Sequence, residues 1–295
     1  MTMEEARRTS CFAVRLNPSG VPGQVAAAAV AALYNELCAY PKPGLVSLVD
    51  NGSHDDMDAR TFMLSIISLR GYFEEVTRGA MGGSGFHDLR ILGLQAESRM
   101  LKATGNINTH RGAIFSLGLL AASVAHLSTT RSLEKGMLGQ VVPRLWSKEL
   151  LLIRPSCARL SHGRIVAERY AMPGAREEAA AGFPHVFAVG LPALQDCLLR
   201  GICFHDATIQ AFFSLMAVLP DSNLLFRGGK EGLLYAQRAA RSFLDGGGVY
   251  RKDWQERALQ IHRQLVARRL SPGGTADLLA ASLFVHTVTF GGVEG

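Results

Sequence analysis

The chain has 295 residues, of which 48% are hydrophobic and 19% are charged, and its formal net charge is +6. This composition excludes a disordered protein, and the length fits one large domain or two medium ones. The positive charge suits an anionic ligand. It is too mild to indicate nucleic-acid binding, and basic residues do not alternate with aromatic residues anywhere in the chain.

Targeting and redox signals are also absent from the sequence. The N-terminus, MTMEEARRTSC, lacks the apolar core of a signal peptide, and the apolar stretch 114–127 is too short and too polar to span a bilayer. The five cysteines include no CxxC pair, and their odd number argues against a disulfide framework. We therefore expect a cytoplasmic protein without a membrane partner.

In chain order, residues 1–20 are predicted to form a flexible lead, and residues 21–290 a single helical domain. Pro41 ends the first helix, an aspartate at or near Asp58 caps the second, and Pro184 and Pro192 bend or interrupt a later one. The predicted helices cover residues 24–38, 59–77, 89–104, 113–127, part of 128–150, 177–199, 205–219, 233–244, 254–268 and 277–289. Alternating strand patterns are almost absent, so the predicted fold class is all-α, a single compact multi-helix domain with polar, glycine-rich loops at helix ends.

Four of these polar segments interrupt the apolar helices. They are PKPGLVSLVDNGSHDDMD (41–58), ATGNINTHRG (103–112), PDSNLLFRGGKEG (220–232) and LSPGGTAD (270–277). Glycine allows close backbone approach, and helix N-termini present unpaired N–H groups to anions. None of the four matches a P-loop or a Rossmann fingerprint.

The charged residues of these segments suit a triphosphate bound with Mg²⁺. We predict phosphate or ATP contacts from Lys42, Asn108, Arg111, Arg227 and Lys230. We predict metal ligands at Asp55, Asp58 and Asp277, since Mg²⁺ prefers oxygen ligands and Asp55 and Asp58 would share a helix face. The alternatives are ordinary ones: helix N-terminal aspartates that complement the helix dipole, and a solvated glycine turn at 227–232.

The same four segments, in this order and spacing, resemble the signature blocks of the triphosphoribosyl-dephospho-coenzyme A synthase family. The resemblance covers roughly residues 25–285. Two positions depart from the pattern: Ser47 stands where many members have Asp, and Asn106 stands where a second Gly is usual. The Ser47 form is similar to the branch that serves malonate decarboxylase rather than citrate lyase.

The resemblance implies a definite reaction in the 21–290 domain. The ribose 2′-hydroxyl of 3′-dephospho-coenzyme A attacks C1′ of the ATP ribose, adenine leaves, and the triphosphate is retained. The product, 2′-(5″-triphosphoribosyl)-3′-dephospho-coenzyme A, is a prosthetic-group precursor that a separate transferase attaches to an acyl carrier protein. The sequence leaves the oligomeric state open, a homodimer included.

Such a displacement needs a group that accepts the proton of the attacking hydroxyl. The candidates are Glu97, His110 and Asp56. Glu97 is favoured because it precedes the second polar segment, and we expect it to lie buried beside Met100 and Ile114, where its pKa would rise. His110 has a suitable unperturbed pKa, and orienting phosphate or ribose is its alternative role.

Two other classes of protein compete with this interpretation. One is an all-α, magnesium-dependent hydrolase of ADP-ribose-type bonds, which would use water as the nucleophile. The other is a helical binding module for a carrier protein, which has no use for aspartates and basic glycine loops at four helix ends. Adenine release that depends on dephospho-coenzyme A separates the first alternative from the transferase.

Overall fold

A computed structural model describes residues 20–130, 137–152, 166, 169–170 and 172–290, and these residues form helices without a strand. The α-helices are α2 (Val21–Cys38), α3 (Ala59–Met81), α4 (Phe86–Ala103), α5 (Arg111–Thr130), α6 (Leu138–Leu152), α8 (Ala175–Ala180), α9 (Leu191–Leu199), α10 (Phe204–Met216), α11 (Ser222–Asp245), α12 (Trp254–Ala267) and α13 (Gly273–Phe290). A π-helical turn, η2 (Val186–Gly190), and a 3₁₀ turn, η3 (Gly248–Tyr250), complete the described elements. The all-α prediction is confirmed, whereas the lead at 1–20, except Gly20, and most of 151–171 lie outside the described residues.

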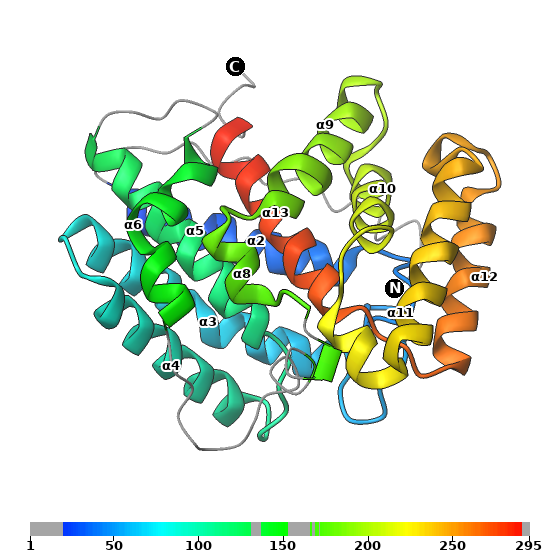
Figure 1. The fold of residues 1–295 in the computed structure, drawn as a ribbon, viewed down its shortest axis with the longest axis horizontal. Coiled ribbons are helices and arrows are strands. Elements are labelled where there is room, and N and C mark those ends of the chain that lie inside the picture. Colours follow the sequence, from blue (N-terminus) through cyan, green and yellow to red (C-terminus); the bar gives the residue numbers. More distant parts are fainter. Residues whose placement is uncertain (1–19, 131–136, 153–165, 167–168, 171, 291–295) are drawn as a thin grey trace.

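Helices α5 and α13 form the centre of the molecule because both are apolar on nearly every side. Helix α5 packs against α2, α3 and α13, and α13 also contacts α10 and α11. In Figure 1, α13 runs between α3–α6 on one side and α10–α12 on the other, and α2 passes behind it. One continuous hydrophobic core links both sides.

One described segment, Arg111–Thr129, has the length and hydropathy of a membrane span. It is the body of α5, and 72% of the span is buried inside the protein. Its apolar surface is therefore explained by the core, as expected for the central helix of a folded domain.

One predicted interruption is confirmed and two predicted boundaries were wrong. The helix expected over 177–199 is interrupted: α8 ends at Ala180, and Pro184 precedes the π turn. Pro192 lies in the first turn of α9, where proline is tolerated. Residues 222–232 are helical rather than a loop, with a kink at Gly229, whose φ is +61°. Helix α13 begins at Gly273, inside the fourth polar segment.

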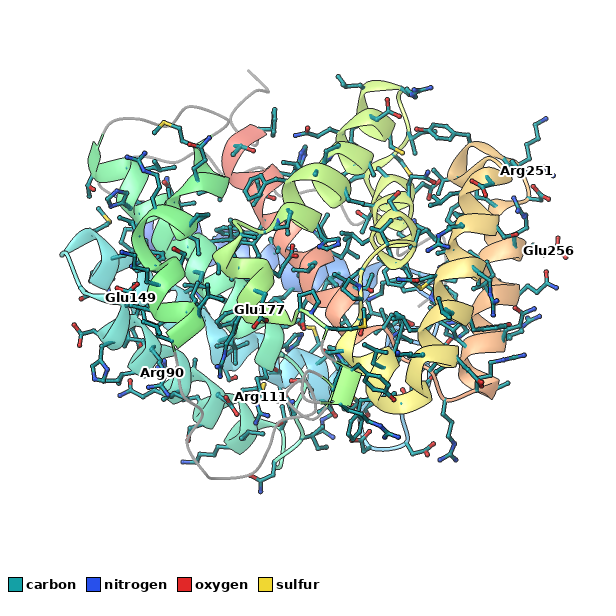
Figure 2. The ribbon with its side chains drawn as sticks, in the orientation of Figure 1. Arg90, Arg111, Glu149, Glu177, Arg251 and Glu256 are labelled. Atoms are coloured by element: carbon teal, nitrogen blue, oxygen red, sulfur yellow. The ribbon has the colours of Figure 1, made fainter. Side chains whose placement is uncertain are left out.

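Charged side chains cover the outer faces of these helices. Figure 2 shows Arg251 and Glu256 projecting from the α12 edge of the molecule, whereas Arg111 lies at the start of α5, close to α4. The polar ends of α5, α11 and α13 are the part of the fold that positions the candidate site.

Candidate active site

The four polar segments meet around the N-terminal end of α13. The Ser53 hydroxyl of the first segment donates to the carbonyl of Leu270 at 2.6 Å. Asp221 of the third segment accepts the backbone N–H of Thr275 at 2.7 Å. Asp277 lies directly against Gly112 of the second segment. All four segments are therefore in contact at this end of α13.

A buried ion pair lies at the inner end of this region. Lys42 is fully buried, and its ammonium group pairs with the carboxylate of Glu36, which is 4% exposed on α2. Removing either partner would leave an uncompensated charge in the interior. This geometry contradicts the prediction that Lys42 contacts phosphate directly. The ammonium group of Lys42 is buried and already paired with the carboxylate of Glu36.

His110 lies beside this pair and is also buried. Its Nδ1 is 2.6 Å from the Ser65 hydroxyl, and its ring packs edge-on against Phe62 with centroids 4.9 Å apart. Burial, with a smaller contribution from the Lys42 charge, lowers the pKa of His110 to about 3. His110 is therefore neutral near pH 7, and the expectation of an unperturbed pKa suited to a general base is wrong in this environment. Its Nε2 has no hydrogen-bond partner among the described residues, so it can receive or donate one bond to a ligand.

Asp277 and Asp221 bring two carboxylates to the same interior. Asp277 accepts the N–H of Ala113 at the start of α5, and its pKa is raised well above the ordinary value by burial first and then by Asp221 and Glu36. Asp221 accepts from Asn223, Leu224 and Thr275, so it caps α11 and α13 together, and burial still raises its pKa. The burial and the neighbouring carboxylates of Asp277 therefore favour its protonated form or a bound cation more than those of Asp221 do.

The three aspartates predicted as metal ligands do not form one ligand set. Asp58 is the N-cap of α3, accepting the N–H of Thr61 at 2.8 Å and its hydroxyl at 2.7 Å, and these bonds lower the pKa of Asp58. Asp55 is exposed, 3.6 Å from the guanidinium of Arg269. Because α3 begins only at Ala59, Asp55 and Asp58 share no helix face, contrary to the prediction. No group of three or more His, Cys, Asp or Glu that could hold a metal occurs within the described residues.

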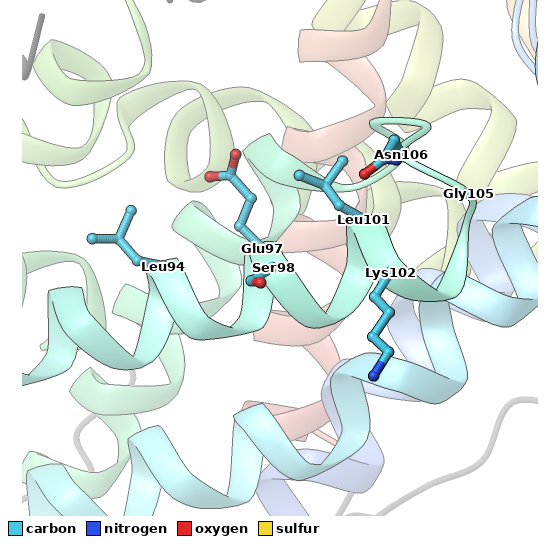
Figure 3. A pocket seen from close by; sticks show the side chains of 7 residues that line it. All are labelled: Leu94, Glu97, Ser98, Leu101, Lys102, Gly105 and Asn106. Atoms are coloured by element: carbon cyan, nitrogen blue, oxygen red, sulfur yellow. The ribbon is translucent and has the colours of Figure 1, made fainter. Parts of the chain in front are cut away.

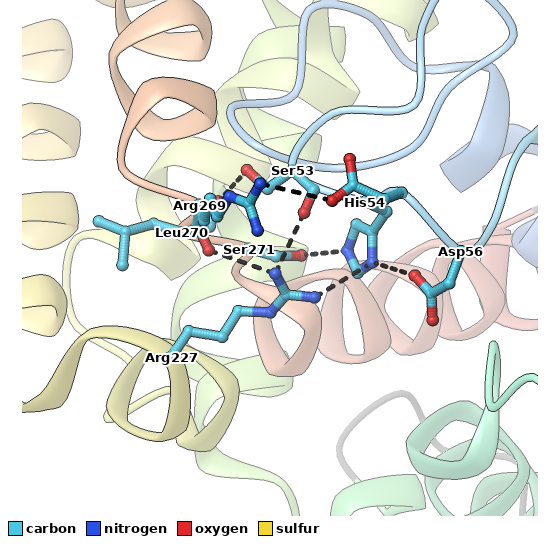
Figure 4. A network of polar contacts seen from close by, with 8 residues as sticks. Ser53, His54, Asp56, Arg227, Arg269, Leu270 and Ser271 are labelled. Carbon is cyan, nitrogen blue, oxygen red and sulfur yellow. Dashed lines mark hydrogen bonds and ion pairs between the residues drawn. The ribbon is translucent and has the colours of Figure 1, made fainter.

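A second network forms the outer rim of the site (Figure 4). The Arg227 guanidinium donates to the carbonyls of Ser53 at 3.1 Å and Arg269 at 3.2 Å, and to Nδ1 of His54 at 3.2 Å. Nε2 of His54 is 2.8 Å from the Ser271 hydroxyl, and the Asp56 carboxylate is 3.6 Å from Nδ1. Burial, and then the charge of Arg227, lowers the pKa of His54. Arg227, Asp55 and Asp56 are thus brought together with a histidine that was not predicted as a site residue.

Lys230 does not join Arg227. Its ammonium group lies 6.0 Å from the centre of the Tyr170 ring, on the other side of the Gly229 kink. Arg227 as a whole is exposed, but its guanidinium is partly buried. This burial is the largest of the causes that lower the pKa of Arg227. The two cations were predicted to act together on phosphate, and only Arg227 belongs to the rim.

Glu97, Asn108 and Arg111 form a third group at the start of α5. The Arg111 guanidinium pairs with the Glu97 carboxylate, and its backbone N–H donates to Asn108 Oδ1 at 3.2 Å. The Glu97 side chain is 24% exposed, so its predicted burial is wrong: the ion pair with Arg111 holds it at the surface.

Two hollows flank these groups. Glu97 lines the first, of about 540 Å³, with Leu94, Ser98, Leu101, Lys102, Gly105 and Asn106 (Figure 3). The second, of about 390 Å³, lies between Asp50, Asn51 and Gly52 and the α12 residues His262, Arg263, Val266 and Ala267. In the first hollow Asn106 has φ +69°, a conformation that asparagine tolerates better than other non-glycine residues, which explains how it replaces the usual glycine.

Sequence reasoning missed four polar residues of the site: Glu36, His54, Ser65 and Ser271. Glu36 carried a usable signal, since it stands on the otherwise apolar, buried face of α2 beside Leu33 and Leu37. His54 and Ser271 are 217 positions apart in the sequence, so only the fold could bring them together.

The fold and site define an all-helical protein in which a buried polar centre and an outer network of arginines both lie near the start of α13. Residues 22–292 match the model of the ATP:dephospho-CoA triphosphoribosyl transferase family. The chain belongs to this family.

Its relatives carry consistent names. A protein of Acinetobacter calcoaceticus named "Probable 2-(5''-triphosphoribosyl)-3'-dephosphocoenzyme-A synthase" is 38% identical over 87% of this chain and 88% of its own length. Proteins with the same name from Pseudomonas fluorescens and Vibrio cholerae are 39% and 34% identical, over 89% and 90% of this chain and 90% and 88% of their own lengths. No solved structure matches the chain.

Proposed function

We propose that this protein joins ATP to 3′-dephospho-coenzyme A, releasing adenine and forming 2′-(5″-triphosphoribosyl)-3′-dephospho-coenzyme A. The observation that carries the proposal is the family match over residues 22–292. The meeting of the four polar segments around the start of α13 supports it, because a triphosphate and a ribose need groups from several segments in one place. One chain supplies all four segments, so the proposal does not require a homodimer.

The bond changes balance without another reactant. The dephospho-coenzyme A ribose oxygen forms a bond to C1′ of ATP, and the C1′–N bond to adenine breaks. The electron pair leaves with adenine, and the hydroxyl proton passes to a base and finally to the leaving adenine. The triphosphate takes no part in this bond change, so its ligands position the substrate.

We propose Glu97 as the base, since its carboxylate lies at the surface of the first hollow and is oriented by Arg111. Asp56 at the rim is the second candidate and His110 the third, because a neutral imidazole with so low a pKa accepts a proton poorly. Glu97→Gln preserves shape and removes basicity, so it should lower kcat by at least about a hundredfold and leave ATP affinity nearly intact. Wild-type turnover in this variant would move the proposal to Asp56.

Arg227 is the proposed phosphate ligand, together with Arg111 and Asn108 at the start of α5. Arg227→Ala should raise the KM for ATP more than the KM for dephospho-coenzyme A. Equal effects on both substrates would indicate a structural role for Arg227, whose guanidinium also joins two loops.

Magnesium is expected to enter with ATP. Mg²⁺ at phosphates commonly uses only one or two carboxylates, so a three-aspartate cage is not needed. Asp277 fits this role best among the three predicted ligands, because its surroundings call for a cation or a proton. When bound, the ion would neutralise part of the triphosphate charge.

The direct test is mass spectrometry of the products made from ATP, Mg²⁺ and dephospho-coenzyme A. The expected product has the summed mass of the two substrates less that of adenine. Free ribose triphosphate in place of this product would indicate hydrolysis.

The product's destination is proposed to be the carrier protein of a malonate decarboxylase, reached through a separate transferase. The support is Ser47, which stands at the sequence position where many members of the family have aspartate; its hydroxyl accepts the N–H groups of Val49 and Asp50. Loading of a malonate decarboxylase carrier and not a citrate lyase carrier, with each transferase supplied, would support this branch. A cytoplasmic location is proposed because the buried cysteines Cys38 and Cys197 are free thiols.

A further inference from the structure

His54 joins two parts of the rim that are far apart in the sequence. Its ring lies between Arg227 of α11 and Ser271, which is two residues before the start of α13 at Gly273 (Figure 4). The side chain is 11% exposed, so the ring is enclosed by these partners and has little freedom to turn.

The two contacts fix the tautomer of His54. A guanidinium can only donate, so Nδ1, at 3.2 Å from Nη2 of Arg227, must be the acceptor. Nε2 then carries the hydrogen and donates to the Ser271 hydroxyl at 2.8 Å. The Asp56 carboxylate, at 3.6 Å from Nδ1, is too distant to compete as a hydrogen-bond partner.

The Arg227 guanidinium is held on three sides. Three of its five N–H groups point to Ser53, Arg269 and His54. Within the described residues the other two N–H groups have no protein acceptor, and two is the number that a bidentate contact with phosphate oxygens requires.

We propose that His54 is a positioning residue for triphosphate binding: its Nδ1 holds the Arg227 guanidinium in one orientation, leaving two N–H groups for phosphate oxygens. The inference rests on the proposed function, since it assumes that Arg227 contacts the triphosphate. It goes further by assigning a role to a residue that itself touches no substrate.

The test uses inorganic tripolyphosphate as the probe and calorimetry as the readout, so it does not depend on turnover. Asparagine can place an amide oxygen near the position of Nδ1, whereas glutamine reaches toward the position of Nε2. His54→Ala and His54→Gln should therefore weaken tripolyphosphate binding about tenfold, the size of one hydrogen bond to a charged group. His54→Asn should stay within about twofold of the wild type because it keeps the acceptor for Arg227.

Three controls make the result decisive. His87→Ala removes an exposed histidine of α4 outside the network and should bind like the wild type. Each variant is also checked for an unchanged melting temperature. In the double variant His54→Ala/Arg227→Ala the loss should equal that of Arg227→Ala alone, because His54 acts only through Arg227.

Equal losses in the alanine, asparagine and glutamine variants, additive losses in the double variant, or unchanged binding in His54→Ala would overturn the inference. Failure of the wild type to bind tripolyphosphate would overturn it as well. His54-dependent binding in a protein that releases no adenine would count against the proposed function alone.

Discussion

Substituting Gly112 by alanine tests the contact between α5 and α13 on which the inner site depends. A Cβ atom at Gly112 would lie 1.9 Å from Oδ2 and 2.6 Å from Cγ of Asp277, whereas real Cβ contacts essentially never fall below 3.0 Å. The Asp277 carboxylate would have to move by about 1 Å and would lose the N–H of Ala113. Overpacking of this kind destabilises by about 1–3 kcal/mol, and the better helix propensity of alanine offsets at most about 1 kcal/mol.

The matched control is Gly23→Ala, in the first turn of α2, where an added Cβ meets nothing within 4 Å. That variant should be neutral or more stable by up to about 1 kcal/mol. For a chain of this size each kcal/mol shifts Tm by roughly 1.5–2 °C, so Gly112→Ala should melt a few degrees below Gly23→Ala in a circular-dichroism scan. Equal melting temperatures would refute the packing of Asp277 against Gly112.

Three further predictions concern the buried pair, the cap and the histidine. Lys42→Met should lower the free energy of unfolding, measured in urea, by about 3–5 kcal/mol because it leaves the Glu36 carboxylate buried without a partner. The double variant Glu36→Leu/Lys42→Met should recover most of this free energy. Equal losses in the single and double variants would contradict the buried pair. Asp58→Ala should lower the free energy of unfolding by about 1 kcal/mol, and Asp58→Asn by much less, because asparagine is also a good helix cap. The magnesium dependence of the activity should be unchanged in both variants. A loss of magnesium dependence in Asp58→Asn would show that Asp58 is a metal ligand. His110 has a folded pKa of about 3, below that of the unfolded chain, so the unfolded state binds more protons and stability falls as the pH drops from about 6.5 toward 3. His110→Asn should lose less unfolding free energy than the wild type between pH 7 and pH 5, and parallel curves would contradict the neutral, buried imidazole.

Local sequence signals were sufficient for much of the fold. Pro41 follows the end of α2 at Cys38, and Asp58 caps α3 through its side chain, as predicted. The mostly apolar run after Arg111 correctly predicted the helix that is observed as α5. The polar, glycine-containing segment 222–232 misled, because the buried Leu224 and Leu225 keep it helical while Gly229 provides only a kink.

The site was less predictable, since partner residues come from distant segments. Asp55 pairs with Arg269, and Glu97 pairs with Arg111. Neither ion pair could be predicted from the spacing of these residues along the chain. The start of α3 at Ala59 agrees with the prediction and leaves Asp55 outside the helix, so the expectation of a shared face for Asp55 and Asp58 did not follow from it. The start of α13 at Gly273 lies four residues before the predicted start at 277. The contacts among the four segments, and their division into a buried centre and an outer rim, depend on how the helices pack and did not follow from the sequence.

The central claim is that the nucleophile is dephospho-coenzyme A rather than water. Adenine can be measured by chromatography while the purified protein is incubated with ATP and Mg²⁺ and dephospho-coenzyme A is increased stepwise. The proposed transferase predicts no adenine without dephospho-coenzyme A, and adenine formed in equal amount to the dephospho-coenzyme A consumed. Adenine released at the same rate in its absence would contradict this account and identify a hydrolase.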